Sequence, residues 1–453
     1  MKKQLLLSVL LCTSVFAFSQ DISGTWVGLL EIQDFKLDFG FNIEKTDSGY
    51  TSTMDIPKQG LSNGKVETTV FIDSTLTLSL PIYQIEYKGR LNSENEFIGT
   101  ISQAGQPFPM KLTKGSMDLN RPQEPMPPFA YYTEEISFKN TDAGITLHGT
   151  LSLPKKDGIF PVALILSGSG PHDRDGAMFG HKPYLVLADQ LTKNGIGVLR
   201  FDERGVGKSE GTFETTSIEQ FEADATAAIT FLKTRKEVNP SKIGLIGHSI
   251  GGIIAPKMAS KRDDINFVVL MAAPGVDGDA LMLAQKAASE RLAGLNEQQI
   301  LQARDAVEGA YKILKSTKLS GGALKDTLNT YYINKYGALL PEDQREQLVT
   351  QLTSLEIIGI IQAKPSTYLS NITCPVLAIN GSKDFQVGAK ENLLAIENAL
   401  PKNEHTKVVE LENLNHLFQE SNTGGISEYS EIEQTLSPRA LGLITEWIKE
   451  QTQ

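Results

Sequence analysis

The chain has 453 residues, which is enough for two or three domains with a large hydrophobic core. Its hydrophobic share of 40% and charged share of 21% are ordinary for a globular protein. The formal net charge of −11 gives no electrostatic support for nucleic-acid binding, so that class of function is excluded.

The N-terminus has the pattern of an export signal. Lys2 and a second lysine precede an apolar run from Leu5 to Phe18, and small residues occur near Ser19. The run is too short to span a bilayer comfortably. We expect residues 1–19 to be a cleaved signal peptide, which leaves a periplasmic or secreted protein without a transmembrane anchor.

The two cysteines bear on anchoring and on disulfides. Cys12 raises the alternative of a lipoprotein, but Leu11 stands where such signals require a small residue, so lipid anchoring is not favoured. After cleavage only Cys374 remains, and no intramolecular disulfide can form.

Residues 20–115 predict a small all-β domain. Roughly eight short runs with alternating hydrophobicity follow one another at hairpin spacing, which is typical of an up-and-down barrel or a sandwich. No catalytic cluster lies in this region. It is interpreted either as a structural module or as a domain that binds a lipid, a glycan or its companion domain. A Pro-rich linker follows at residues 116–130.

Residues 131–453 predict an α/β domain. A β-hairpin around residues 142–144 is followed by short apolar strands that alternate with helices, and this pattern indicates a mostly parallel sheet with helices on both faces. The turn signal Asn239-Pro240 is expected to precede the strand that begins near Lys242. The span of about 277–369 lacks strand-like runs and is expected to be a helical cap inserted above the sheet.

The motif G-x-S-x-G, the nucleophile elbow, occurs twice in the chain. Ser249 lies in Gly247-His-Ser-Ile-Gly251, between a predicted strand and a predicted helix. Ser209 lies in a polar, Gly-rich run that no strand enters directly. The elbow requires strand, turn and helix, so we interpret Ser249 as a nucleophile and Ser209 as a loop serine.

A serine nucleophile on this kind of sheet is followed in the chain by an acid and then by a histidine. Only His405 and His416 follow Ser249, and Asp384 stands just beyond a predicted strand. His416 follows the next strand, whereas His405 precedes that strand. Active-site groups gather at the carboxyl ends of parallel strands. The sequence therefore predicts a triad of Ser249, Asp384 and His416.

The oxyanion of such a reaction is stabilised by backbone N–H groups. One donor is expected from Ile250 and a second from Ser169, in the loop after the strand at 162–166. His172, Asp173 and Arg174 follow in this loop and are interpreted as groups that orient it, that contact substrate, or that form a buried salt bridge. The spacing of His172 and Asp175 is compatible with metal, but no third ligand lies at a suitable spacing, so no metal site is predicted.

Several motifs together resemble the α/β-hydrolase superfamily over about residues 131–450. They are Gly247-His-Ser-Ile-Gly251, Gly168-Ser-Gly-Pro-His-Asp-Arg-Asp175, Asp202-Glu-Arg-Gly-Val-Gly-Lys-Ser209, Gly381-Ser-Lys-Asp384 and Asn415-His-Leu-Phe-Gln419. More narrowly, they resemble secreted bacterial carboxylesterases with a GSGPxDRD-type oxyanion loop. The resemblance implies a serine hydrolase of carboxylic esters with a helical cap, a separate N-terminal domain, and structural support from Asp202 and Arg204.

The leading interpretation is an esterase that forms an acyl-enzyme on Ser249, acts on a small-molecule ester and needs no cofactor. A peptidase or thioesterase on the same fold is the enzymatic alternative. The alternative from another class is a non-catalytic secreted ligand-binding protein. The sequence does not determine the acyl group, the alcohol or the oligomeric state.

Overall fold

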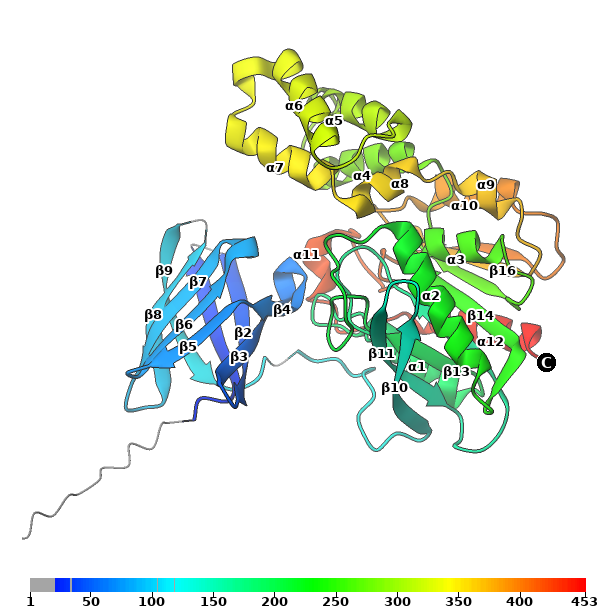
Figure 1. Ribbon diagram of the computed structural model, residues 1–453, viewed down its shortest axis with the longest axis horizontal. Coiled ribbons are helices and arrows are strands. Elements are labelled where there is room, and N and C mark those ends of the chain that lie inside the picture. The colour runs from blue at the N-terminus through cyan, green and yellow to red at the C-terminus, as the bar shows by residue number, and fades with distance from the viewer. Residues whose placement is uncertain (1–20, 33–34, 104, 118) are drawn as a thin grey trace, which may run out of the picture. The chain divides into compact units, whose positions relative to one another are not determined.

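The structure is a computed structural model that describes residues 21–32, 35–103, 105–117 and 119–453 (Figure 1). The chain divides into two compact units, of which the second consists of Pro57–Gly60 and Leu119–Gln453. The first unit holds the N-terminal β-sheet. The predicted signal peptide, together with Cys12, lies outside the described residues.

The first unit contains one nine-stranded antiparallel sheet in the order β4-β3-β2-β1-β9-β8-β7-β6-β5. The edge strands β4 and β5 are separated in sequence by Glu67 alone, and β3 approaches β5, so the sheet curls toward a barrel. Its inner face is filled by large side chains such as Trp26, Phe41, Tyr87 and Phe97. The strands are β1 (Gly24–Ile32), β2 (Phe35–Thr46), β3 (Gly49–Ile56), β4 (Leu61–Val66), β5 (Thr68–Ile72), β6 (Thr75–Leu80), β7 (Ile85–Leu91), β8 (Glu96–Gln103) and β9 (Gln106–Lys114), with the short 3-10 turn η2 (Pro81–Tyr83). The 3-10 turn η1 (Pro57–Gln59) belongs to the second unit.

The second unit is built on an eight-stranded sheet in the order β10-β11-β13-β12-β14-β15-β16-β17. The first two strands form the predicted hairpin, and β12 to β17 run parallel. The strands are β10 (Tyr132–Asn140), β11 (Ile145–Leu153), β12 (Phe160–Leu166), β13 (Gly197–Phe201), β14 (Val238–His248), β15 (Val268–Met271), β16 (Val376–Gly381) and β17 (Lys407–Leu411). This sheet confirms the predicted α/β-hydrolase fold.

One strand boundary differs from the prediction. Asn239-Pro240 was expected to be a turn before the strand, but β14 begins at Val238 and includes both residues. The pairing of β14 with β12 changes register between Phe160 and Val162. This irregularity accommodates a proline at the start of a strand, where the missing N–H is tolerated.

Helices cover both faces of the sheet, as the continuous apolar strands require. Alternate residues of β12 enter different cores: Leu164 packs with α2, α3 and α10, whereas Ile165 packs with α1 and α12. Figure 1 shows α1 and α2 against the strands. The helices are α1 (Pro183–Lys193), α2 (Ile218–Lys233), α3 (Gly251–Ala259), α10 (Ala389–Ala399), α11 (Ile426–Tyr429) and α12 (Pro438–Gln451).

Between β15 and β16 the chain forms helices only, which lie together above the sheet in Figure 1. They have their own core around Leu314, Leu328 and Tyr332. They are α4 (Gly278–Leu292), α5 (Glu297–Ser316), α6 (Gly321–Tyr336), η3 (Gly337–Leu339), α7 (Glu342–Leu352), α8 (Leu355–Gln362) and α9 (Pro365–Leu369). We call this group the cap.

The Pro-rich segment is fastened to the second unit. Arg121 donates hydrogen bonds to the carbonyl oxygens of Gly180 (2.9 Å) and Ser430 (2.6 Å). Gln123 donates to the carbonyl of Leu436 (2.7 Å) and accepts from the N–H of Thr435 (2.7 Å). Residues from Leu119 onward therefore belong structurally to the α/β unit rather than to a free linker.

Candidate active site

The strand order reverses at β12, because β13 lies on one side of it and β14 on the other. In open α/β sheets the ligand crevice lies beyond the carboxyl ends of the strands at such a reversal. The two loops at this position are the Gly168–Gly170 loop after β12 and the turn at Ser249 after β14. The strand order therefore places the Gly168–Gly170 loop and the Ser249 turn at the expected ligand crevice.

Ser249 occupies a sharp turn between β14 and α3. Its φ of +53° is unfavourable for a residue with a Cβ atom, and such strain concentrates at functional sites. The turn is held by a hydrogen bond from Ser249 N to the carbonyl of Met271 (2.9 Å). A Cβ atom at Gly247 would lie 2.2 Å from the carbonyl oxygen of Gly251, and one at Gly251 would lie 2.2 Å from that of Leu166. Both glycines are therefore required by the turn.

Asp384 and His416 lie beyond the carboxyl ends of β16 and β17, and the structure brings them together. Nδ1 of His416 is 2.7 Å from Oδ2 of Asp384, and both side chains are buried. The other carboxylate oxygen accepts the N–H groups of Gln386 (2.8 Å) and Val387 (2.9 Å). A carboxylate held by these bonds fixes the Nδ1–H tautomer of His416, so Nε2 is available to accept a proton.

His416 lies next to the serine turn. Its ring centroid is 5.0 Å from that of His248, the residue before Ser249, and its carbonyl oxygen is 3.1 Å from Nε2 of His248. Within the described part of the chain, no hydrogen bond joins the hydroxyl of Ser249 to His416. Catalytic contacts of this kind are often long in a free enzyme and shorten when substrate binds.

The loop after β12 lies against the nucleophile. A Cβ atom at Gly168 would be 3.2 Å from Cβ of Ser249. The next residue, Ser169, is exposed. Among the described residues, no hydrogen-bond acceptor is paired with the backbone N–H of Ser169 or of Ile250. Within that part of the chain, both predicted oxyanion donors are therefore available to a substrate oxygen.

His172, Asp173 and Arg174 hold this loop in shape. Nε2 of His172 is 2.7 Å from the carbonyl oxygen of Ser169, and burial lowers the pKa of His172, so the neutral ring donates this bond. Asp173 accepts the N–H groups of the residues at 175 and 177, in an Asx-type turn. Arg174 pairs with Asp202 through two hydrogen bonds of 3.0 and 2.8 Å.

Two carboxyl groups, of the buried Glu203 and the half-buried Glu356, bond to the same loop, and the sequence predicted neither. Glu203 accepts the N–H of His172 (3.0 Å), and Glu356 of the cap accepts the N–H of Gly170 (3.1 Å). Burial raises the pKa of Glu203 well above its usual value, and the nearby Glu356 adds to the shift. Burial also raises the pKa of Glu356. No motif marks Glu356, because it lies 186 residues after its partner.

Tyr184 and His248 were also missed. The hydroxyl of Tyr184 accepts the N–H of Gly168 (3.1 Å) and lies 3.2 Å from Nδ1 of His248. Burial lowers the pKa of His248 to about 3, so the ring is neutral. Since the carbonyl of His416 can only accept, Nε2 of His248 carries the proton and Nδ1 accepts from Tyr184. These bonds connect the loop after β12 to the loop that holds His416.

Ser209 and His405, the alternatives to Ser249 and His416, lie away from the Asp384–His416 pair. Ser209 is buried, donates to the carbonyl of Asp202 (2.7 Å) and accepts the N–H of His148 (2.9 Å). His405 is an exposed residue that precedes β17, at the opposite end of the strand from His416. Neither is joined to Asp384 by a hydrogen bond among the described residues.

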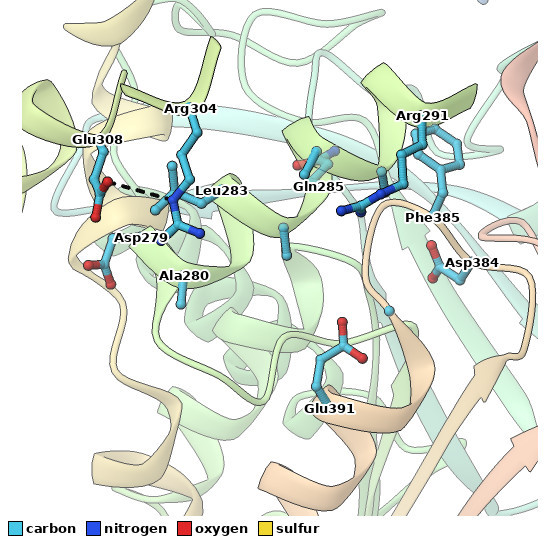
Figure 2. A pocket seen from close by; sticks show the side chains of 14 residues that line it. Asp279, Ala280, Leu283, Gln285, Arg291, Arg304, Glu308, Asp384, Phe385 and Glu391 are labelled. Carbon is cyan, nitrogen blue, oxygen red and sulfur yellow. Dashed lines mark ion pairs between the residues drawn. The ribbon is translucent and has the colours of Figure 1, made fainter. Parts of the chain in front are cut away.

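Two cavities lie between the cap and the segment after Asp384. The first has a volume of about 580 Å³, and Figure 2 shows its charged side chains, among them Arg291, Arg304 and Glu391. The second has a volume of about 420 Å³ and a more apolar wall. Phe385, the residue after Asp384, lines both.

The described ranges show neither a metal centre nor a membrane span. These ranges contain no group of three or more His, Cys, Asp or Glu side chains arranged to hold a metal ion. They also contain no helix with the length and hydrophobicity needed to cross a bilayer.

Several known proteins are similar to this chain. Esterase EstD of Thermotoga maritima is 28% identical over 63% of the chain, and the match spans 62% of EstD, which is less than two thirds of its length. Protein YfhR of Escherichia coli is 37% identical over 22% of the chain and 34% of its own length. A solved structure of a Pyrococcus furiosus esterase superposes with a TM-score of 0.43 and 18% identity, over 75% of this chain and all of that one.

A family model described as serine aminopeptidase, S33 (Hydrolase_4) matches residues 181–419, which is more than half of the chain. The matched region includes the serine turn, the cap, Asp384 and His416. The chain therefore belongs to this hydrolase family.

Proposed function

We propose that the protein is a serine hydrolase of carboxylic esters. Ser249 attacks the acyl carbonyl, His416 takes the serine proton and passes it to the leaving alcohol, and Asp384 holds the imidazole. Water then attacks the acyl-enzyme, with His416 acting as the base, and releases the acid. The N–H groups of Ser169 and Ile250 stabilise the oxyanion in both steps.

The observation that carries this proposal is the buried pair of His416 and Asp384 beside the strained serine turn. The 2.7 Å contact at Nδ1 directs the basic Nε2 atom away from Asp384. The ring lies beside His248, which precedes Ser249 in the chain. The similarity to esterase EstD supports an ester as the substrate.

Turnover of p-nitrophenyl acetate tests the proposal. The wild type should show a burst of p-nitrophenol equal to the enzyme concentration if deacylation is slow, and Ser249→Ala should lose on the order of 10⁴–10⁶ in kcat because a triad acts as a unit. Asp384→Asn should be severely impaired, because the amide favours the wrong tautomer of His416. Wild-type protein without turnover of any activated ester would contradict the proposal and favour a ligand-binding role.

An aminopeptidase is the second candidate, and one feature of the loop favours it. The carboxyl groups of Glu203 and Glu356 accept backbone N–H groups of the loop after β12, and no cation is paired with either of them among the described residues. A substrate with a free amino group would supply this missing cation. Cleavage of aminoacyl p-nitroanilides, lost when the amino group is acetylated, would favour the peptidase over the esterase.

The proposed setting of this activity is outside the cytoplasm. The lysines and apolar run of residues 1–19 support export with cleavage after Ser19. Mass spectrometry of the protein secreted or released from the periplasm should give an N-terminus at Gln20. An uncleaved chain in the cytoplasmic fraction would contradict export.

A further inference from the structure

The loop that carries His416 contains two buried amide side chains that the proposed reaction does not use. Asn415 and Gln419 lie at its two ends, and both are fully buried. The amide nitrogen of Asn415 donates to Oε1 of Gln419 (2.9 Å), and its Oδ1 atom accepts the N–H groups of Leu417 (3.0 Å) and Gln419 (2.9 Å). The N–H of Asn415 also donates to the carbonyl of Gln419 (3.0 Å). Residues 415–419 therefore form a turn that is closed by its own first and last residues.

The side chain of Gln419 joins this turn to other parts of the α/β unit. Its amide nitrogen donates to the carbonyl of Gln434 (3.1 Å) and lies 3.0 Å from Nε2 of His181. His181 is a buried residue just before α1. Its Nε2 atom is 2.9 Å from the carbonyl oxygen of Tyr429, and its Nδ1 atom is 2.9 Å from the hydroxyl of Thr435. We define the polar frame as the side chains of Asn415, Gln419, His181 and Thr435.

The ring of His181 is neutral, and its contacts fix the position of its proton. Burial and the nearby Arg121 lower the pKa of His181 to about 4. A carbonyl oxygen can only accept, so Nε2–H donates to Tyr429, and Nδ1 accepts from the hydroxyl of Thr435. Both ring nitrogens thus have partners in the protein. His181 therefore contributes through its position and not through proton transfer.

The polar frame connects segments that are far apart in the chain. His181 is 238 residues from Gln419, and the N–H of Thr435 donates to the side chain of Gln123 (2.7 Å). Residues 415–419 lie in no helix or strand, so these hydrogen bonds, and not a regular element, set the conformation of the turn. Misplacement of a reacting group by about 1 Å can reduce the rate on the order of 10²-fold. The rate should therefore depend on the polar frame.

We propose that the polar frame positions His416, and that Gln419 and His181 are positioning residues for its proton transfers. This inference rests on the proposed function, in which His416 is the base, and adds two residues that act through it. Both side chains are fully buried, so neither has surface to offer to a substrate. Loss of their contacts should consequently lower kcat and leave KM nearly unchanged.

Hydrolysis of p-nitrophenyl acetate by two matched variants measures this effect. Gln419→Leu removes a buried amide from the polar frame. Asn140→Leu removes a buried amide at the end of β10, which donates to Asp224 (2.7 Å) and accepts the N–H of Ala143 (3.1 Å). Gln419→Leu should lower kcat about tenfold to a hundredfold, with KM within about threefold, because the base is displaced and not removed. Asn140→Leu, assayed below its Tm, should keep kcat within about twofold.

Variants of His181 separate the proposed role from a general loss of stability. His181→Leu removes both ring contacts and should lower kcat about as much as Gln419→Leu. His181→Gln places an amide nitrogen near the position of Nε2, where it can still donate to Tyr429, and should recover most of the lost activity. Thr435→Val removes only the hydroxyl bonded to Nδ1 and should lower kcat about threefold.

The proton on Nδ1 of His416 gives a readout that needs no substrate. A proton in a short hydrogen bond to a carboxylate has a strongly downfield NMR resonance, and here the acceptor is Asp384 (2.7 Å). This resonance should shift or broaden in Gln419→Leu. It should be unchanged in Asn140→Leu.

Wild-type kcat and an unchanged resonance in Gln419→Leu and His181→Leu would overturn the inference. An equal loss of kcat in Asn140→Leu, or a His181→Gln protein no more active than His181→Leu, would also overturn it. If Gln419→Leu does not fold, Thr435→Val decides: a lower kcat supports the inference, and a wild-type kcat or a change in KM alone overturns it. Failure of the proposed function is distinguishable, because His416→Ala would then retain turnover.

Discussion

Replacement of Tyr184 by phenylalanine removes one hydroxyl group from the connection between the oxyanion loop and the base. In the wild type this hydroxyl accepts the N–H of Gly168 (3.1 Å) and donates to Nδ1 of His248 (3.2 Å). Phenylalanine keeps the ring but leaves both buried groups without a partner. Each such loss costs about 1–3 kcal/mol, so the variant should be less stable by roughly 2–6 kcal/mol.

The effect on catalysis follows from the position of Gly168. Its backbone lies against Ser249, and the next N–H, of Ser169, is the proposed oxyanion donor. Removal of an oxyanion donor costs about 10²–10³ in kcat, and Tyr184→Phe displaces the donor without removing it. We expect kcat for p-nitrophenyl acetate to fall about tenfold to a hundredfold, while KM changes little.

Steady-state kinetics and thermal unfolding measure the two effects. At roughly 2–4 °C per kcal/mol, Tm should fall by about 4 °C or more. Tyr368→Phe is the matched control, because the buried hydroxyl of Tyr368 has no hydrogen-bond partner among the described residues. It should leave both kcat and Tm near the wild-type values. A Tyr184→Phe protein with wild-type kcat would refute the role assigned to this connection.

Three further results are expected. His416→Ala should abolish turnover with the fold retained, whereas His405→Ala, at an exposed position, should keep kcat within a few-fold; the reverse result would contradict the triad. Burial raises the pKa of Glu356, so the wild-type protein loses stability as the pH rises and this carboxyl group ionises. Glu356→Gln has no such group, and its Tm should therefore rise relative to that of the wild type between pH 5 and pH 8. A Tm difference that is constant over this range would contradict the prediction. A chain that begins at Leu119 should hydrolyse p-nitrophenyl acetate at the wild-type rate. A chain that begins at Pro128 lacks the hydrogen bonds of Arg121 and Gln123, so its Tm should be lower than that of the chain that begins at Leu119. Equal Tm values for the two chains would refute this prediction.

Local patterns were sufficient to predict the α/β fold and the position of the serine turn. Alternation of apolar strands with helices is typical of a parallel sheet. Gly247 and Gly251 are required in the serine turn, because a Cβ atom at either position would lie only 2.2 Å from a backbone carbonyl oxygen. The choice of His416 over His405 also needed only the direction of one strand. Each of these predictions rests on a short pattern that is visible in the sequence, although the atom that excludes a side chain at Gly251 belongs to Leu166, at the end of β12.

The groups that connect the loops of the site could not be predicted in the same way. Glu356 reaches Gly170 from the cap, and Tyr184 reaches His248 from α1, so each contact depends on tertiary packing. The start of β14 at Val238 was missed because Asn-Pro is normally a turn signal. Here the register change between Phe160 and Val162 accommodates the proline, and no local sequence pattern predicts that register change.

Covalent labelling with a fluorophosphonate tests the central claim, that Ser249 is the nucleophile, most directly. Peptide mapping of the labelled protein should find the phosphonate on Ser249, with no label in Ser249→Ala. Ser209→Ala should be labelled like the wild type, because the Ser209 hydroxyl is buried and bonded to the carbonyl of Asp202. A label on Ser209, or full labelling of Ser249→Ala, would contradict the account.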